Sequence, residues 1–182
     1  MGSYIRLDQS EAEDWHHICA EHAQYYATGA PLRVMDHIRK LEEITLGFPC
    51  HQLQHSLMTA TLARAAGADD ETLVMALCHD IGKSISVPNH AAIGAEILRP
   101  YVSDDHYRAV LHHQEFQALY YFHHFGMPNT QREAYREAGW FALAEALVDD
   151  WDMPAFDPDF SPDPLESFEP AVVRVFSAPR MM

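Results

Sequence analysis

The chain has 182 residues, 48% of them hydrophobic and 21% charged, which excludes a disordered or low-complexity protein and predicts a single domain over residues 1–182. Twelve Lys and Arg against 27 Asp and Glu give a formal net charge of −15, so nucleic acid and membrane surfaces are not expected partners. Three cysteines without paired spacing, no signal peptide and no run of about 20 apolar residues predict a cytoplasmic protein.

Apolar residues recur at three- and four-residue intervals along nearly the whole chain, and no strand-like alternation lasts beyond a few residues. We therefore predict an all-α fold. Gly and Pro mark the expected helix ends, and Ser, Asn or Asp stands at several expected starts. In chain order, the predicted helices cover residues 11–27, 31–44, 51–67, 71–82, 89–99, 104–122, 129–136, 140–148 and 168–176.

Several of these helices carry more specific expectations. Pro31 is placed in the first turn of the second helix, where a residue without an N–H is tolerated. The helix over 71–82 is apolar on almost every side and should therefore be central and buried. Four prolines between residues 151 and 164 predict irregular structure there, and residues 153–182 are expected to form a tail that ends in one short docked helix.

The first indication of chemistry is the dipeptide His79-Asp80 in the segment MALCHDIGK, at the end of the apolar helix. Burying an imidazole beside a carboxylate costs several kcal/mol unless the two are paired, hydrogen-bonded or bound to a metal. Metal coordination removes that cost. The alternative is a histidine stabilised by the helix dipole, with Asp80 capping a loop.

The chain has thirteen histidines, and most of them fall between His37 and His124. Three other predicted helices carry histidines that could converge with the dipeptide, and the segment DDWD offers a further carboxylate. These residues are His55 in HQLQHS, His90 in NH, His112 or His113 in VLHHQEF, and Asp152 or Asp149. A set of imidazoles and carboxylates is typical of a metal centre.

The order of a histidine, a His-Asp pair and a distant aspartate, between residues 52 and 152, resembles the HD superfamily of metal-dependent enzymes, whose fold is a helical bundle. Two further histidines match the members of that superfamily with a dinuclear site, in which Asp80 would bridge two metals. His113 is preferred to His112 because HQEFQ resembles the ligand helix of small HD proteins. The metal ligands that the resemblance implies are His55, His79, Asp80, His90, His113 and Asp152.

Other residues have weaker claims on the site. His123 and His124 lie ten and eleven residues after His113, on roughly the same helix face, and are weaker candidates for ligands. The alternative is that they pack among the neighbouring aromatic residues. Lys83 follows Asp80 in HDIGK, a stretch similar to myo-inositol oxygenase, in which the corresponding lysine contacts substrate. Lys83 and Asp80 are therefore the candidate catalytic residues. The alternative for Lys83 is a solvated cation at a helix end.

The resemblance implies two classes of reaction. One is a di-iron oxygenase that cleaves a small polar hydroxylated substrate with dioxygen, as in myo-inositol oxygenase and the hydroxy-aminoethylphosphonate dioxygenase. The other is a metal-dependent phosphohydrolase with Mn or Zn, and VPNHAAIGAEILRPYV, YYFHHFG and FDPDF resemble a group of predicted HD phosphohydrolases. Arginines that could bind a phosphoryl group are scarce near the ligand segments, which favours the oxygenase and two iron ions.

The likeness to the phosphonate dioxygenase does not extend to its substrate. Gln117 and Asp149 stand where basic residues of that family hold the phosphonate, so another small-molecule substrate is expected. A third class is also considered, in which the metal only stabilises a helical scaffold without catalysis.

Overall fold

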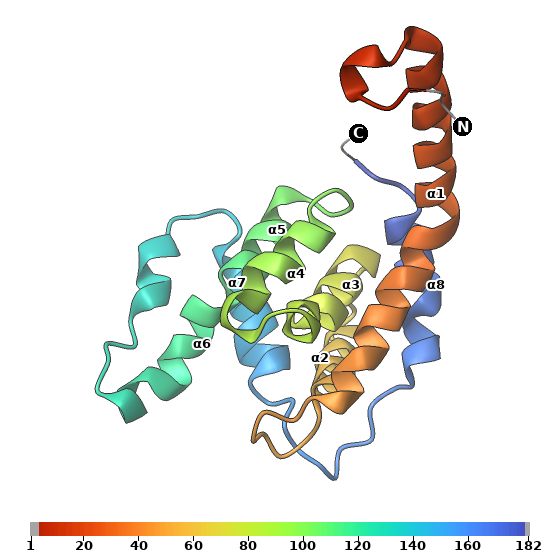
Figure 1. Cartoon of the computed structure of the whole chain (residues 1–182). Helices are drawn as coiled ribbons and strands as arrows, with labels where there is room; N and C mark the ends of the chain where they lie inside the picture. Colours follow the sequence, from red (N-terminus) through yellow and green to blue (C-terminus); the bar gives the residue numbers. More distant parts are fainter. Residues whose placement is uncertain (1–3, 181–182) are drawn as a thin grey trace.

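The computed structural model describes residues 4–180, and every regular element in that range is helical, which confirms the predicted all-α fold (Figure 1). The α-helices are α1 (Ala12–Arg39), α2 (Gln52–Ala65), α3 (Asp70–Cys78), α4 (His90–Leu98), α5 (Asp104–Leu111), α6 (His113–Tyr121), α7 (Phe141–Glu145) and α8 (Glu169–Phe176). Short 3-10 segments join them: η1 (Leu7–Gln9), η2 (Lys40–Glu43), η3 (Ile81–Ser84), η4 (Val87–Asn89), η5 (Phe122–Phe125), η6 (Gln131–Tyr135) and η8 (Leu165–Phe168). Among the described helices, none combines the length and apolarity needed to cross a membrane.

Helix α3 lies at the centre of the bundle, as its apolar sequence predicts. All six residues from Leu73 to Cys78 are buried, and α2, α5 and α8 pack around the helix. Asp69 caps its start by accepting a hydrogen bond from the backbone N–H of Thr72 at 2.9 Å. The helix ends at Cys78 and not at Gly82, so His79 and Asp80 emerge from the interior at its carboxyl end.

The prediction of two helices over residues 11–27 and 31–44 is wrong, because α1 runs without a break from Ala12 to Arg39 and contains Pro31. Proline inside a helix removes one hydrogen bond and costs about 3 kcal/mol. Val34, Met35 and Ile38 follow within two turns and are buried in the core, and α1 packs on α8. Burying each of these side chains contributes about 1.5–3 kcal/mol, which outweighs the proline.

The predicted helix over 104–122 is divided at His112, whose backbone (φ −106°, ψ 6°) departs from helical geometry. The imidazole of His112 stacks against Trp140 with ring centroids 5.1 Å apart and lies 4.5 Å from the Tyr135 ring. His113, the first residue of α6, is fully buried. The break therefore sends two adjacent histidines to different parts of the molecule.

The expectation that helical structure ends at Val148 is also wrong. After α7 the chain continues as a π-helical segment, η7 (Ala146–Asp152), in which the N–H of Met153 bonds the carbonyl of Val148 at 2.8 Å. Such wide turns are rare and frequently occur at functional sites. Asp152 is therefore the last residue of a helical segment and does not belong to the irregular tail.

Candidate metal centre

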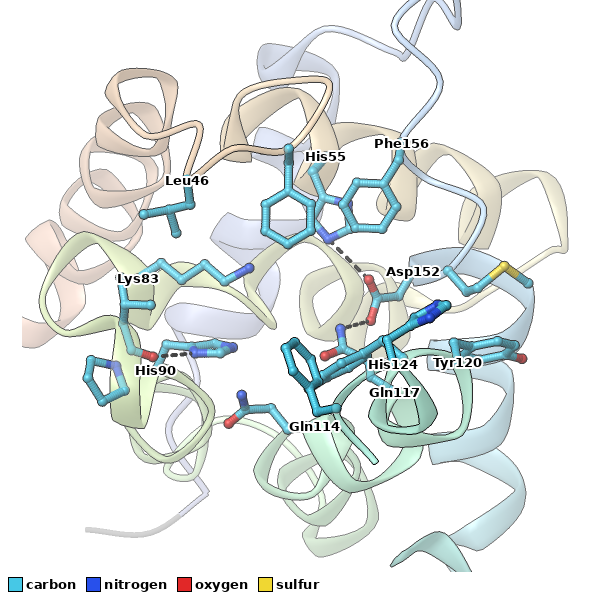
Figure 2. A pocket seen from close by; sticks show the side chains of 16 residues that line it. Leu46, His55, Lys83, His90, Gln114, Gln117, Tyr120, His124, Asp152 and Phe156 are labelled. Carbon is cyan, nitrogen blue, oxygen red and sulfur yellow. Dashed lines mark hydrogen bonds and ion pairs between the residues drawn. The ribbon is translucent and has the colours of Figure 1, made fainter. Parts of the chain in front are cut away.

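A cavity of about 820 Å³ opens beside α2, α6 and η7. Figure 2 shows His55 and Phe156 on one side of it, facing Gln117 and His124 on the other. Three predicted metal ligands, His55, His90 and Asp152, reach its surface. The other lining residues are Leu46, Phe48, Lys83, Val87, Pro88, Gln114, Tyr120, Tyr121, Phe125 and Met153.

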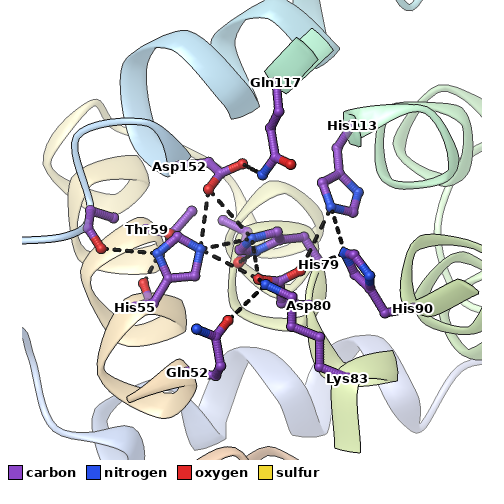
Figure 3. A network of polar contacts seen from close by, with 12 residues as sticks. Gln52, His55, Thr59, His79, Asp80, Lys83, His90, His113, Gln117 and Asp152 are labelled. Atoms are coloured by element: carbon purple, nitrogen blue, oxygen red, sulfur yellow. Dashed lines mark hydrogen bonds and ion pairs between the residues drawn. The ribbon is translucent and has the colours of Figure 1, made fainter. Parts of the chain in front are cut away.

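At the floor of this cavity the structure brings together all six predicted ligands, from five separate parts of the chain (Figure 3). All six side chains are buried. Their ligand atoms form two groups, in each of which the atoms lie within 4.8 Å of one another. The first group is His55, His79 and Asp152, and the second group is Asp80, His90 and His113.

The first group joins α2, the end of α3 and η7. His55 Nε2 lies 3.1 Å from Asp152 Oδ1 and 3.2 Å from His79 Nε2. The distance from His79 Nε2 to Asp152 Oδ1 is 3.8 Å. Three atoms with lone pairs therefore face one point.

The second group joins the loop after α3 to the first residues of α4 and α6. His90 Nε2 lies 3.1 Å from Asp80 Oδ1 and 3.3 Å from His113 Nε2. His113 Nε2 is 3.6 Å from the same Asp80 oxygen. These atoms face a second point, adjacent to the first.

Asp80 links the two groups through its two carboxylate oxygens. Oδ1 faces the second group, whereas Oδ2 lies 3.4 Å from His79 Nε2 and 3.5 Å from His55 Nε2. This arrangement is that of a carboxylate able to bridge two cations. It arises because Asp80 (φ −100°, ψ 4°) leaves the helical path between α3 and η3.

The four imidazoles of the site are oriented in the same way, because the Nδ1 of each one bonds a backbone carbonyl. The partners are Ala155 for His55 (2.9 Å), Ala76 for His79 (2.8 Å), Val87 for His90 (2.8 Å) and Val110 for His113 (2.7 Å). A carbonyl only accepts, so the proton of each neutral ring is assigned to Nδ1, and Nε2 is left with a lone pair. Four such lone pairs converge on the centre, which is the arrangement that metal-binding histidines require.

Two carboxylate oxygens of the centre also lack donors. Asp80 Oδ1 and Asp152 Oδ1 are buried and have no hydrogen-bond partner among the described residues. A buried anionic oxygen without a partner is costly, and a bound cation would remove the cost. Four imidazole nitrogens and two carboxylates suit iron, manganese and zinc, so the residues present fit a metal pair.

The electrostatics of the six side chains agree with this fit. Burial opposes a charge on His79, but the Asp80 and Asp152 carboxylates outweigh it and raise the pKa of His79 to about 9. Burial alone would raise the pKa of Asp152, yet its contacts with His55 and His79 lower it to about 2. Burial lowers the pKa of His113. Both carboxylates are therefore ionised at neutral pH, and an entering metal would displace a proton from His79.

Three polar side chains hold the carboxylates in place. Lys83 Nζ donates to Asp80 Oδ2 at 2.5 Å and to Gln52 Oε1 at 2.7 Å. Gln117 Nε2 donates to Asp152 Oδ2 at 2.5 Å. Sequence reasoning missed Gln52 and considered Gln117 only as a substrate-binding position. Their spacing from the predicted ligands was the available signal. Gln52 precedes His55 by three residues and Gln117 follows His113 by four. Residues three or four apart share one face of a helix.

The alternative carboxylate, Asp149, lies outside the centre. Its two oxygens accept hydrogen bonds from the buried guanidinium of Arg132 at 2.6 and 2.8 Å. Arg132 also donates to the carbonyl of Phe116. This ion pair anchors η6 to η7 and explains why Asp149 and Asp152 have different roles three residues apart.

The alternative histidines are also outside the two groups. His112 packs on aromatic rings, as described above. The rings of His123 and His124 lie 3.9 Å apart in η5, and of these two only His124 lines the cavity. Arg64, the arginine on the His55 helix, bonds Asp163 and Ser167 and stacks on Phe168.

The fold and the ligand set define a helical protein with a histidine–aspartate centre able to hold metal. The sequence profile of the HD domain matches residues 53–153, more than half of the chain, and the protein therefore belongs to the HD domain family. No curated protein matches the sequence.

Proposed function

We propose that this protein is a dinuclear metal enzyme of the oxygenase type, in which dioxygen is used to cleave a small hydroxylated substrate. The observation that supports it best is the carboxylate of Asp80, whose two oxygens face two separate groups of buried ligand atoms. The ligands assigned to the two ions are His55, His79, Asp80, His90, His113 and Asp152. Iron is the metal that we propose, because its redox chemistry is what an oxygenase needs.

The residues of the chain have distinct parts in this proposal. When bound, a pair of iron ions supplies the redox chemistry that activates dioxygen and removes hydrogen from the substrate. Lys83 holds Asp80 at the cavity edge and is the first candidate for contact with a substrate oxygen. Gln117 keeps Asp152 oriented toward His55. Phe156 stacks on the His55 ring at 4.4 Å and shields it from solvent.

The charges around the cavity favour an oxygenase over a phosphohydrolase. Transfer of a phosphoryl group is favoured by cationic donors aimed at the developing negative charge, and arginine is the usual one. Among the described residues that line the cavity, Lys83 is the single Lys or Arg, and Asp80 already pairs with it at 2.5 Å. Arg132 and Arg64 are engaged in ion pairs elsewhere. A phosphate would therefore depend on the metals alone.

The test is metal analysis of protein purified without added metal, followed by two activity panels. We expect two iron ions per chain and oxygen uptake with hydroxylated substrates. Asp80→Ala should lose both the metal and the oxygen uptake. Asp150→Ala is the matched control, because Asp150 is exposed and lies outside both groups, and it should retain both.

Two results would contradict the proposal. Manganese or zinc in the centre, together with release of phosphate from mono- or diesters, would establish a phosphohydrolase. Unfolding by a chelator, with no turnover in either panel, would establish a metal-stabilised scaffold.

A further inference from the structure

We infer that the substrate is amphipathic, with a hydroxylated head at the metal centre and an apolar chain or ring that fills the outer cavity. The inference rests on the proposed function only in placing the head at the metals. It changes the sequence-based expectation of a small polar hydroxylated substrate. The features that carry it are the size of the cavity, its two aromatic walls and the location of its polar groups (Figure 2).

The cavity is larger than a small polyol requires. Its volume of about 820 Å³ lies in the upper part of the range of about 300–1,000 Å³ that is typical of sites for drug-sized ligands. A polar molecule of a few carbons would leave most of this space to water. The available space therefore favours a substrate with a substantial second part.

One wall is aromatic and comes from two distant segments. The rings of Phe48 and Phe156 stack with centroids 5.2 Å apart and an interplanar angle of 18°. Beside them Leu46 is half exposed and lines the cavity, with a backbone φ of 51°. This left-handed conformation costs about 1–2 kcal/mol in a residue with a side chain. The fold holds an apolar side chain at the cavity mouth in spite of that strain.

The opposite wall is built by α6 and η5. The rings of Tyr121 and Phe125 meet edge to face at 6.3 Å, and both line the cavity. Phe125 is 70% exposed, an unusual state for a phenyl ring. An apolar ligand between the two walls would bury part of Phe125 and would contribute about 25 cal/mol for each Å² of apolar surface removed from water.

The polar groups that could bind a substrate are unevenly distributed. Lys83 and Gln117 lie beside the carboxylates of the centre and already donate to them. In the rest of the cavity, the polar groups that line it among the described residues are the Gln114 amide, the His124 imidazole and the hydroxyl groups of Tyr120 and Tyr121 at the ends of aromatic rings. Hydroxyl groups along the whole length of a substrate would outnumber these few partners, and each hydroxyl that loses water without gaining a partner is unfavourable. The geometry therefore points to a polar head and an apolar body.

The test measures binding and not turnover. Protein loaded with redox-inert Zn(II) would be titrated calorimetrically with 2-hydroxypropanoate, 2-hydroxyhexanoate and 2-hydroxyoctanoate, which share one chelating head and differ in chain length. We expect the affinity to rise about two- to fourfold for each added methylene, as burial of the chain in an apolar cavity predicts. An affinity that does not change with chain length, or no binding of any of the three, would overturn the inference.

Two variants separate the cavity from general hydrophobic binding. Phe125→Ala should weaken 2-hydroxyoctanoate by about tenfold and leave 2-hydroxypropanoate unchanged. Leu119→Ala is the control, because Leu119 is an exposed apolar residue of α6, the helix directly before η5, and does not line the cavity; it should change neither. Equal effects of the two variants would overturn the inference. If the protein released phosphate from esters while its affinity for the 2-hydroxy acids still rose with chain length, the oxygenase proposal would be overturned and the inference of an amphipathic substrate would stand.

Discussion

The two groups of ligands differ in how the fold supports them. The first group stands on α2, the end of α3 and η7, and the contacts between α2 and these elements run through the core. The second group stands on the first residues of α4 and α6, each next to an interruption of helical structure at Asn89 or His112. Figure 1 shows α6 at the side of the molecule away from α1 and α8. The fold therefore supports the first group of ligands more firmly than the second.

The groups also differ in ligand number and exposure. With Asp80 Oδ2 included, the first group presents four ligand atoms, whereas the second presents three. His90, in the second group, is the most exposed of the six, at 4%. We therefore expect the first group to hold its ion more tightly, and the second to leave more coordination positions for substrate. Each prediction below would break or sharpen this comparison.

The largest effect is expected from Asp80→Ala, because this change removes a ligand from both groups. The variant should retain neither ion, whereas His79→Ala, which removes a ligand of the first group, should lose at least the ion of that group. The measurement is metal content per chain after gel filtration. Full occupancy in either variant would show that the ligand assignment is wrong.

His113→Ala should remove only the second ion. It leaves the second group with two ligand atoms, while all four atoms of the first group stay in place. Metal analysis should give about one ion per chain, with loss of activity. Loss of both ions would mean that the two halves assemble as one unit and would contradict the comparison.

The stability of the metal-free protein should fall as the pH rises from about 6.5 to about 9. The pKa of His79 is about 9 in the folded chain and about 6.5 in an unfolded one, so the folded state binds the proton more tightly. The stabilisation is fully present below pH 6.5 and disappears as the pH rises through 9. In the same interval, affinity for metal should rise about tenfold per pH unit.

Urea unfolding of chelator-treated protein at several pH values measures the first effect, and metal titration measures the second. His79→Ala should remove the pH dependence of the unfolding free energy in this interval. A wild-type unfolding free energy that is flat between pH 6.5 and 9 would show that the Asp80 and Asp152 charges do not act on His79 as described.

The smallest effect is expected from Gln117→Ala, which removes the donor to Asp152 but no ligand. Loss of such a supporting hydrogen bond typically lowers metal affinity about 10- to 100-fold. Gln114→Ala is the matched control, since Gln114 lies on the same helix and lines the cavity but is not one of the six ligands. Competition with a metal-binding dye would measure both. If the Gln117→Ala and Gln114→Ala variants bound metal with equal affinity, Gln117 would have no role at the first group.

The sequence was informative where local patterns decide the outcome. The three-to-four periodicity predicted α2 and α4 to within two residues, and the His-Asp pair at the end of an apolar helix indicated the centre. The path of the chain at Pro31, His112 and Asp152 was not predictable in this way, because burial on α8, stacking on Trp140 and the Arg132–Asp149 ion pair decide it. These contacts join residues that are distant in the sequence.

The walls of the cavity were beyond prediction for the same reason. Phe48 and Phe156 lie on segments without helical periodicity, and only the folded chain stacks them on each other. Nothing in the sequence distinguishes these two rings from the aromatic residues of the core.

The π-helical turn before Asp152 has a consequence for insertions and deletions in this protein. In a regular α-helix each residue rotates the side-chain direction by about 100°. Deleting one residue from η7 would allow an ordinary helix, with better backbone geometry, but would swing the terminal carboxylate away from the other ligands. Shortening η7 by one residue should therefore spare folding and remove the metal site, although all six ligand residues are still present in the chain.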